Sequence, residues 1–304
     1  MKAVRFHQYG DATVLTTDEV AQPVPGPGQV LIQVSGTSFN PVDAAIRAGY
    51  LQQAFPVTLP QTPGADVAGA VAQVGDGVTR FKAGDHVVGF LPMTSDGAAA
   101  EFVIASAEVL APAPTAVPLA DAAALPAVGL TAWQAVYEHA GVQPGQRILV
   151  HGAGGAVGGY AVQLAAQAGA TVVATAGARN ADRVRGYGAQ VAGRSADGVT
   201  GEFDAVLNFA PAPPADMATL AGLVRPGGIL VSTATPAPQD DARGVRSVSM
   251  YVRSDAQQLA KLVDRVDAGK LHVHVAERVT LDELPAVHAR NDAGTLPGKT
   301  IITV

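Results

Sequence analysis

Four glycines lie close together after a short apolar run, and their spacing suits the binding of a phosphate group. Residues 147–150, RILV, form a run of the length of a buried strand, and an alanine-rich helical segment follows the glycines. The free N–H groups and the positive dipole end of such a helix attract a pyrophosphate. The spacing is G-x-x-G-x-x-G, since Val157 stands where the strict G-x-G-x-x-G pattern has its last glycine. The expected pyrophosphate contacts are Gly152, Gly154, Gly155, Ala156, Val157 and Gly158. A tight turn without a ligand is the alternative interpretation.

The residues after the next β-branched run indicate which dinucleotide would bind. NAD-binding folds usually carry an Asp or Glu about twenty residues beyond the glycine turn, where it bonds the ribose hydroxyls. This chain has Thr-Ala-Gly at residues 175–177, and its first carboxylate is Asp182. Guanidinium groups nearby would favour a 2′-phosphate, so the sequence predicts NADPH. The expected contacts are Gly177, Arg179 and Arg183, with Arg194 as a further candidate. A solvated helix face is the alternative for the arginines.

Length and composition exclude several classes of partner and site. A chain of 304 residues is long enough for two domains with separate cores. The net charge of -6 argues against a nucleic-acid backbone as partner, which leaves a small molecule. The absence of cysteine excludes disulfides, thiolate metal sites and cysteine nucleophiles. No apolar run has the length of a membrane span, and residues 1–15 do not form the apolar core of a signal peptide, so a cytoplasmic protein is expected.

The pattern of residue types along the chain changes near Ala120, which predicts two domains. Before this point, short β-rich runs alternate with Pro-Gly, Gly-Asp and Asp-Gly turns, and one helical turn is expected over 41–47. After it, strands alternate with helices, which predicts a parallel, doubly wound sheet and an α/β fold. The stretch 255–271 predicts an amphipathic helix, and His272 and His274 alternate as in a strand. The last strand, KTIITV, should return to the first domain.

Five phrases in this order resemble the medium-chain dehydrogenase/reductase superfamily, and within it the zinc-independent quinone oxidoreductase and enoyl reductase branch. They are NPVDAAIRAG, TPGADVAGAVAQVGDGVTRFKAGDHVVGF, AAALPAVGLTAWQAV, HGAGGAVGGYAVQLAAQAGA and the terminal PGKTIITV. The resemblance implies a GroES-like β-rich catalytic domain, expected over 1–124 and 268–304, and a Rossmann domain over 125–267 that binds a nicotinamide cofactor.

The same resemblance implies that no metal is bound. Where zinc-dependent relatives carry a cysteine ligand and Gly-His-Glu, this chain has Asn40 and Gly64-Ala65-Asp66. A catalytic zinc needs three protein ligands, and the scattered histidines do not supply them.

Further site residues are carried over from the family onto matching positions. Thr131 is expected near the phosphates or nicotinamide, and the strand-end residues Asn208, Phe209, Ala210 and Ser232 should line the nicotinamide side. Asn40 would position a carbonyl or the cofactor amide, and Tyr50 would donate a hydrogen bond or proton; an aromatic packed at a loop edge is the alternative for Tyr50. Asp43 is expected to cap a helical turn.

The expected reaction is hydride transfer from NADPH to a quinone or an α,β-unsaturated carbonyl, because alcohol oxidation lacks a metal to activate it. Two alternatives stay open: a non-catalytic NADPH-binding redox sensor, and an enoyl-thioester reductase of lipid or polyketide synthesis. The β-rich stretch 245–253 would be a sheet edge, which predicts a homodimer.

Overall fold

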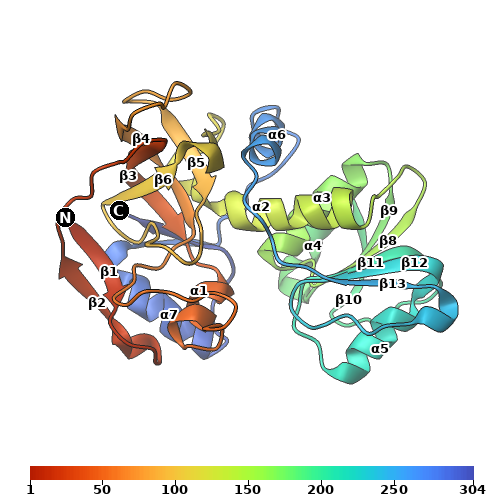
Figure 1. The fold of residues 1–304 in the computed structure, drawn as a ribbon. Coiled ribbons are helices and arrows are strands. Elements are labelled where there is room, and N and C mark those ends of the chain that lie inside the picture. The colour runs from red at the N-terminus through yellow and green to blue at the C-terminus, as the bar shows by residue number, and fades with distance from the viewer. The chain divides into compact units, whose positions relative to one another are not determined.

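The computed structural model describes residues 1–304 and divides into two compact units, one made of residues 1–127 and 254–304 and the other of residues 128–253. The first unit is built from both ends of the chain, coloured red and blue in Figure 1. It is rich in strands, whereas strands and helices alternate in the second. The expected α/β fold, with one β-rich part and one doubly wound parallel sheet, is confirmed.

Mostly antiparallel strands form the first unit. A two-stranded sheet pairs β1 with β2, and a seven-stranded sheet has the order β14-β15-β3-β4-β5-β7, with β6 paired to β3. The strands are β1 (Lys2–Phe6), β2 (Leu15–Glu19), β3 (Gln29–Ser38), β4 (Asp66–Val74), β5 (His86–Phe90), β6 (Phe102–Ser106), β7 (Leu110–Pro112), β14 (Glu277–Thr280) and β15 (Thr300–Thr303). The last strand, β15, lies antiparallel to β3, so the C-terminus returns to the first sheet as expected.

Helices of the first unit pack around this sheet. They are α1 (Pro41–Arg47), α6 (Ala256–Asp267), α7 (Leu284–Asp292) and the short turns η1 (Ala12–Val14), η2 (Ala107–Val109), η3 (Ala120–Ala124) and η6 (Leu281–Glu283). The helix expected over 41–47 is confirmed, because a proline at its first position and a capping box between Asn40 and Asp43 start it there.

The six strands of the second unit are all parallel, in the order β10-β9-β8-β11-β12-β13. The strands are β8 (Arg147–His151), β9 (Thr171–Thr175), β10 (Ala189–Gly193), β11 (Phe203–Asn208), β12 (Val224–Ser232) and β13 (Arg246–Ser249). The helices are α2 (Pro126–Trp133), whose first residues belong to the other unit, η4 (Gln134–His139), α3 (Ala156–Gln167), α4 (Ala178–Gly186), α5 (Pro214–Gly222) and η5 (Asp241–Arg243). The strand β13 lies at a sheet edge, as the stretch 245–253 predicted.

The amphipathic helix expected from residue 255 is present as α6, with Leu259, Leu262, Val263 and Val266 buried. It groups with the first unit, although the expected domain boundary placed it with the Rossmann domain. It packs beside β7, and the carboxylate of Asp267 accepts hydrogen bonds from the backbone N–H groups of Thr115 and Ala116 at 2.8 and 2.9 Å. These contacts tie α6 to the first unit.

The strand expected around His272 and His274 is wrong, since residues 272–276 have no regular structure. No helix in the molecule combines the length and hydropathy of a membrane span.

Candidate cofactor and substrate site

The glycine turn lies between β8 and α3, at the carboxyl edge of the parallel sheet. Gly152 has a φ of 80°, a conformation that side chains other than glycine rarely adopt. A Cβ on Gly158 would lie 2.4 Å from the carbonyl oxygen of Gly152, so this position also requires glycine. Gly155 is the N-cap of α3 and has no side chain to bond the first N–H groups. The N–H groups of residues 156–158 therefore have no acceptor within the helix, and they fit a pyrophosphate.

Thr175 connects the end of β9 to this turn. Its hydroxyl oxygen accepts a hydrogen bond from the Gly152 N–H at 3.1 Å and lies 2.9 Å from Nδ1 of His151, while its carbonyl accepts the Ala153 N–H. Burial lowers the pKa of His151, which favours the neutral ring. Thr175 is buried and stabilises the turn.

Arg179 and Arg194 line one pocket at the ends of β9 and β10, together with Gly177 and Arg185. No carboxylate lines this pocket. Arg179 and Arg194 are both exposed, whereas Arg185 forms an ion pair with Asp182 at 2.6 Å. The sequence candidates Gly177, Arg179 and Arg194 are thus brought together in a basic pocket.

Arg183 makes a different contact from the one expected. Its Nη2 donates to the Gly154 carbonyl at 2.8 Å and to Oδ1 of Asn180 at 3.1 Å, and its guanidinium lies 5.9 Å from the ring centre of Tyr187. It does not line the pocket of Arg179. Arg183 therefore stabilises the glycine turn, and its expected contact with the cofactor phosphate stays a prediction.

The polar side chains at the ends of β11 and β12 face inward. Asn208 is fully buried; its Nδ2 donates to the Ser232 hydroxyl at 3.0 Å, and its Oδ1 accepts the Ala210 N–H at 3.2 Å. The Ser232 hydroxyl donates to the carbonyl of Thr235. These two side chains stabilise the loops after the strands, and their place beside the nicotinamide stays a prediction. Phe209 and Ala210 are half-buried.

In the first unit, the side chain of Asn40 belongs to a buried polar cluster. Its Nδ2 donates to Oδ2 of Asp66 at 2.8 Å, and its Oδ1 accepts from Nζ of Lys299 at 2.8 Å. Asp66 and Lys299 are themselves an ion pair at 3.2 Å, with side chains 0% and 3% exposed. The sequence singled out Asn40 but not Lys299, because a lone lysine near the end of a chain is usually exposed.

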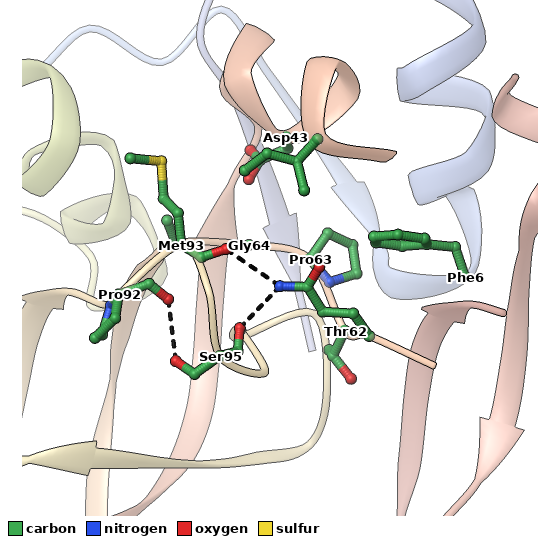
Figure 2. A pocket seen from close by; sticks show the side chains of 12 residues that line it. Phe6, Asp43, Thr62, Pro63, Gly64, Pro92, Met93 and Ser95 are labelled. Carbon is green, nitrogen blue, oxygen red and sulfur yellow. Dashed lines mark hydrogen bonds between the residues drawn. The ribbon is translucent and has the colours of Figure 1, made fainter. Parts of the chain in front are cut away.

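Asp43 has the structural role that was expected. Its Oδ2 accepts the Asn40 N–H at 2.8 Å at the start of α1. Burial raises the pKa of this carboxyl to about 7, against the stabilising N–H groups of Asn40 and Gly64. Asp43 lines a small cavity of about 20 Å³, which is room for a single water molecule. Figure 2 shows Asp43 among the side chains that line this cavity. In this cavity Gln61 donates to the carbonyls of Met93 and Ser95.

Tyr50 and Thr131 differ in exposure. Tyr50, just after α1, is 84% exposed, so its hydroxyl is accessible from solvent. It lines a surface pocket with Arg47 and Asp292. Thr131 is buried in α2. The alternative for Tyr50, an aromatic ring packed at a loop edge, is wrong because the side chain is largely exposed.

Two protein families match parts of the chain. Residues 26–115 match the alcohol dehydrogenase GroES-like domain, and residues 162–302 match the zinc-binding dehydrogenase family. The chloroplast envelope quinone oxidoreductase homolog of Arabidopsis thaliana is 34% identical over 99% of this chain and 98% of its own length. The chain belongs to the medium-chain dehydrogenase/reductase superfamily, on its quinone oxidoreductase branch. A chloroplastic quinone-oxidoreductase homolog of Spinacia oleracea is 42% identical, over 62% of this chain and 59% of that protein.

Solved structures agree with this assignment. The quinone oxidoreductase of Coxiella burnetii superposes with a TM-score of 0.91 at 28% identity, covering 100% of this chain and 99% of that one. The chain is therefore an oxidoreductase of a family that binds a nicotinamide cofactor and acts on small molecules. The glycine turn and the free helix N-terminus fit such a cofactor.

No group of three or more His, Cys, Asp or Glu side chains in the structure could hold a metal ion. The carboxylate of Asp66 is already paired with an ammonium group.

Proposed function

We propose that this protein is an NADPH-dependent, zinc-independent reductase of quinones or α,β-unsaturated carbonyl compounds. The observation that carries the cofactor preference is the pocket of Arg179 and Arg194, which has no carboxylate in its lining. A 2′-phosphate is bonded by guanidinium groups and repelled by carboxylates, so NADPH is favoured over NADH. Arg194 joins Arg179 as a phosphate contact in this proposal.

The substrate class is supported by the relatives, several of which are named quinone oxidoreductases. The nicotinamide supplies a hydride when the cofactor is bound, and reduction then leaves negative charge on a carbonyl oxygen. Hydrogen-bond donors of the chain stabilise that charge. We assign the orienting donor to Asn40 and the proton donor to the exposed hydroxyl of Tyr50. Because no zinc ligand set is present, no step of this proposal needs a metal.

The experiment is NADPH oxidation measured against a panel of quinones and 2-alkenals, with wild type, Arg179→Ala and Tyr50→Phe side by side. We expect turnover by the wild type, a KM for NADPH at least tenfold higher in Arg179→Ala with an unchanged KM for NADH, and a lower kcat in Tyr50→Phe. Tight NADPH binding with no turnover of any compound would favour the redox-sensor alternative. Selective turnover of enoyl thioesters would favour the enoyl-thioester reductase.

A homodimer is also proposed, joined at the free edge of β13. This strand pairs only with β12, and Tyr251 beside it is 72% exposed. Exposed strand edges pair readily with a second copy. Light scattering tests this, since a monomer at assay concentration would remove the proposal. A cytoplasmic location stays a proposal as well, to be tested by localisation of a tagged protein, because two plant relatives carry chloroplast names.

A further inference from the structure

Lys299 is a buried lysine whose ammonium group has a complete set of acceptors. Its Nζ donates to Oδ1 of Asn40 at 2.8 Å, to Oδ2 of Asp66 at 3.2 Å and to the carbonyl of Phe39 at 3.3 Å. An ammonium group has three hydrogens, so each has one oxygen partner. Lys299 precedes β15, and its partners lie in two other segments, the linker of Phe39 and Asn40 between β3 and α1 and the start of β4. The ammonium thus connects three separate segments at the base of α1.

Asp66 supplies the compensating charge. It is 0% exposed and accepts hydrogen bonds at Oδ2 from the Ser38 hydroxyl, Asn40 and Lys299, and at Oδ1 from the Ala127 N–H at 2.7 Å. Buried charges persist only where they are paired and hydrogen-bonded. This ion pair is fully bonded, so its geometry is strongly constrained.

The ion pair determines the orientation of the Asn40 amide. The amide oxygen faces the ammonium and the amide nitrogen faces the carboxylate. A flipped amide would place N–H against ammonium and oxygen against carboxylate, so only one orientation is stable. The amide nitrogen carries two hydrogens, and one of them is donated to Asp66 in a hydrogen bond. The second N–H is therefore a donor of fixed direction. The positive charge of the Lys299 ammonium beside the amide oxygen also polarises the amide and strengthens that donor.

We propose that Lys299 is a positioning residue, which with Asp66 fixes the Asn40 amide so that its second N–H bonds the carbonyl oxygen of the substrate. This inference rests on the proposed function, in which Asn40 is the orienting donor. The buried ammonium group of Lys299 provides a fixed positive charge at this site. The ammonium acts through Asn40 and does not touch the substrate.

The test is chemical rescue of Lys299→Ala by methylammonium, which can occupy the space and charge of the lost group. We expect the kcat of Lys299→Ala to be at least tenfold below that of wild type, with the KM for NADPH within twofold. Methylammonium chloride should raise the kcat of this variant at least threefold. Sodium chloride at equal ionic strength should restore nothing. Lys82→Ala, which removes an exposed lysine of the same unit, should match wild type and not respond to methylammonium. An unchanged kcat, or a loss that methylammonium does not reverse, would overturn the proposal.

A second measurement does not depend on turnover. In protein labelled with ¹⁵N-asparagine, the side-chain amide protons of Asn40, assigned with Asn40→Ala, should exchange slowly with solvent in the wild type. They should exchange faster in Lys299→Ala and slow again with methylammonium. Unchanged exchange in Lys299→Ala rejects the positioning role. If wild type reduces no quinone or enone, the proposed function fails while this measurement still decides the role of Lys299.

The variant Lys299→Ala leaves Asp66 buried without its partner and is checked for folding by circular dichroism. If it does not fold, the pair Lys299→Met with Asp66→Asn removes both charges together. We expect this double variant to fold and to have at least tenfold lower kcat. A wild-type kcat in the double variant would overturn the proposal, because the Lys299–Asp66 ion pair would then contribute only to the stability of the fold.

Discussion

Nη2 of Arg183 donates a hydrogen bond of 2.8 Å to the carbonyl oxygen of Gly154, so a side chain from α4 holds the backbone of the glycine turn. The same nitrogen reaches Asn180, whose side chain lies 3.1 Å from the place of a Cβ on Gly154. The hydrogen bond from Arg183 to this carbonyl thus holds the backbone of the turn against α4. Arg183 therefore stabilises the turn at which the pyrophosphate is proposed to bind, whereas Arg179 is the residue proposed to bond the 2′-phosphate.

The two arginines should respond differently to substitution. Arg183→Ala removes a hydrogen bond from a charged donor, which contributes about 1.5–3 kcal/mol, and the loosened turn should weaken NADPH and NADH by similar factors of roughly ten to a hundred. Arg179→Ala should weaken NADPH alone. Fluorescence titration with both cofactors separates the two effects. Selective loss of NADPH in Arg183→Ala would show that Arg183 contacts the 2′-phosphate after all.

Gly158→Ala should disrupt the same turn by steric overlap. The added Cβ would lie 2.4 Å from the Gly152 carbonyl oxygen and 2.6 Å from Cα of Ala153, so α3 must shift away from the turn. Forced packing of this kind typically costs about 1–3 kcal/mol. We expect a lower Tm and at least tenfold weaker NADPH binding. Gly186→Ala is the matched control, because no atom lies within 4 Å of its added Cβ, and it should bind NADPH normally.

Much of the fold could be predicted from the sequence because its signals are local. The proline and the capping pair fixed the helix at 41–47, and apolar periodicity identified α6. Where local signals mislead, tertiary pairing decides. The strand β12 begins at Val224 because it pairs with β11 from Phe203 onward. His272 and His274 alternate like a strand, yet no neighbouring strand pairs with them.

The site was predictable where backbone requirements dictate residue type, as at Gly152 and Gly158. The direction of a long side chain was not predictable, so the hydrogen bond from Arg183 to the Gly154 carbonyl could not be inferred from the sequence. Lys299 and Asn40 are 259 positions apart in the sequence, so no spacing argument could join them. Only the pairing of β15 with β3 brings their segments together.

Asp43 should make the protein less stable as the pH rises. Its folded-state pKa is about 7, well above the ordinary value of 3.8. Between these values the folded protein retains a proton that the unfolded chain has released, so stability falls with pH across this window. We expect wild type to lose about 2–3 kcal/mol relative to Asp43→Asn between pH 5 and pH 8. Urea unfolding at several pH values measures it, and parallel curves for both proteins would contradict the prediction.

His288 should have the opposite effect, on the acid side. It is fully buried, its ring packs edge-on against Phe39 at 4.9 Å, and neither ring nitrogen has a partner. Burial, with the nearby Arg47 charge, lowers its pKa to about 3, despite Asp292. The unfolded chain binds a proton below pH 6.5 that the folded protein does not, so stability falls on acidification.

The change His288→Leu removes this acid sensitivity while keeping an apolar side chain against Phe39. Between pH 7 and pH 5, wild type should lose about 2 kcal/mol relative to the variant, since each pH unit below the unfolded-state pKa contributes about 1.4 kcal/mol. His86→Gln, at an exposed histidine, should follow wild type. Urea unfolding of all three proteins at pH 5, 6 and 7 provides the comparison. Equal losses in wild type and His288→Leu would mean that the folded protein accommodates a charged ring at this position.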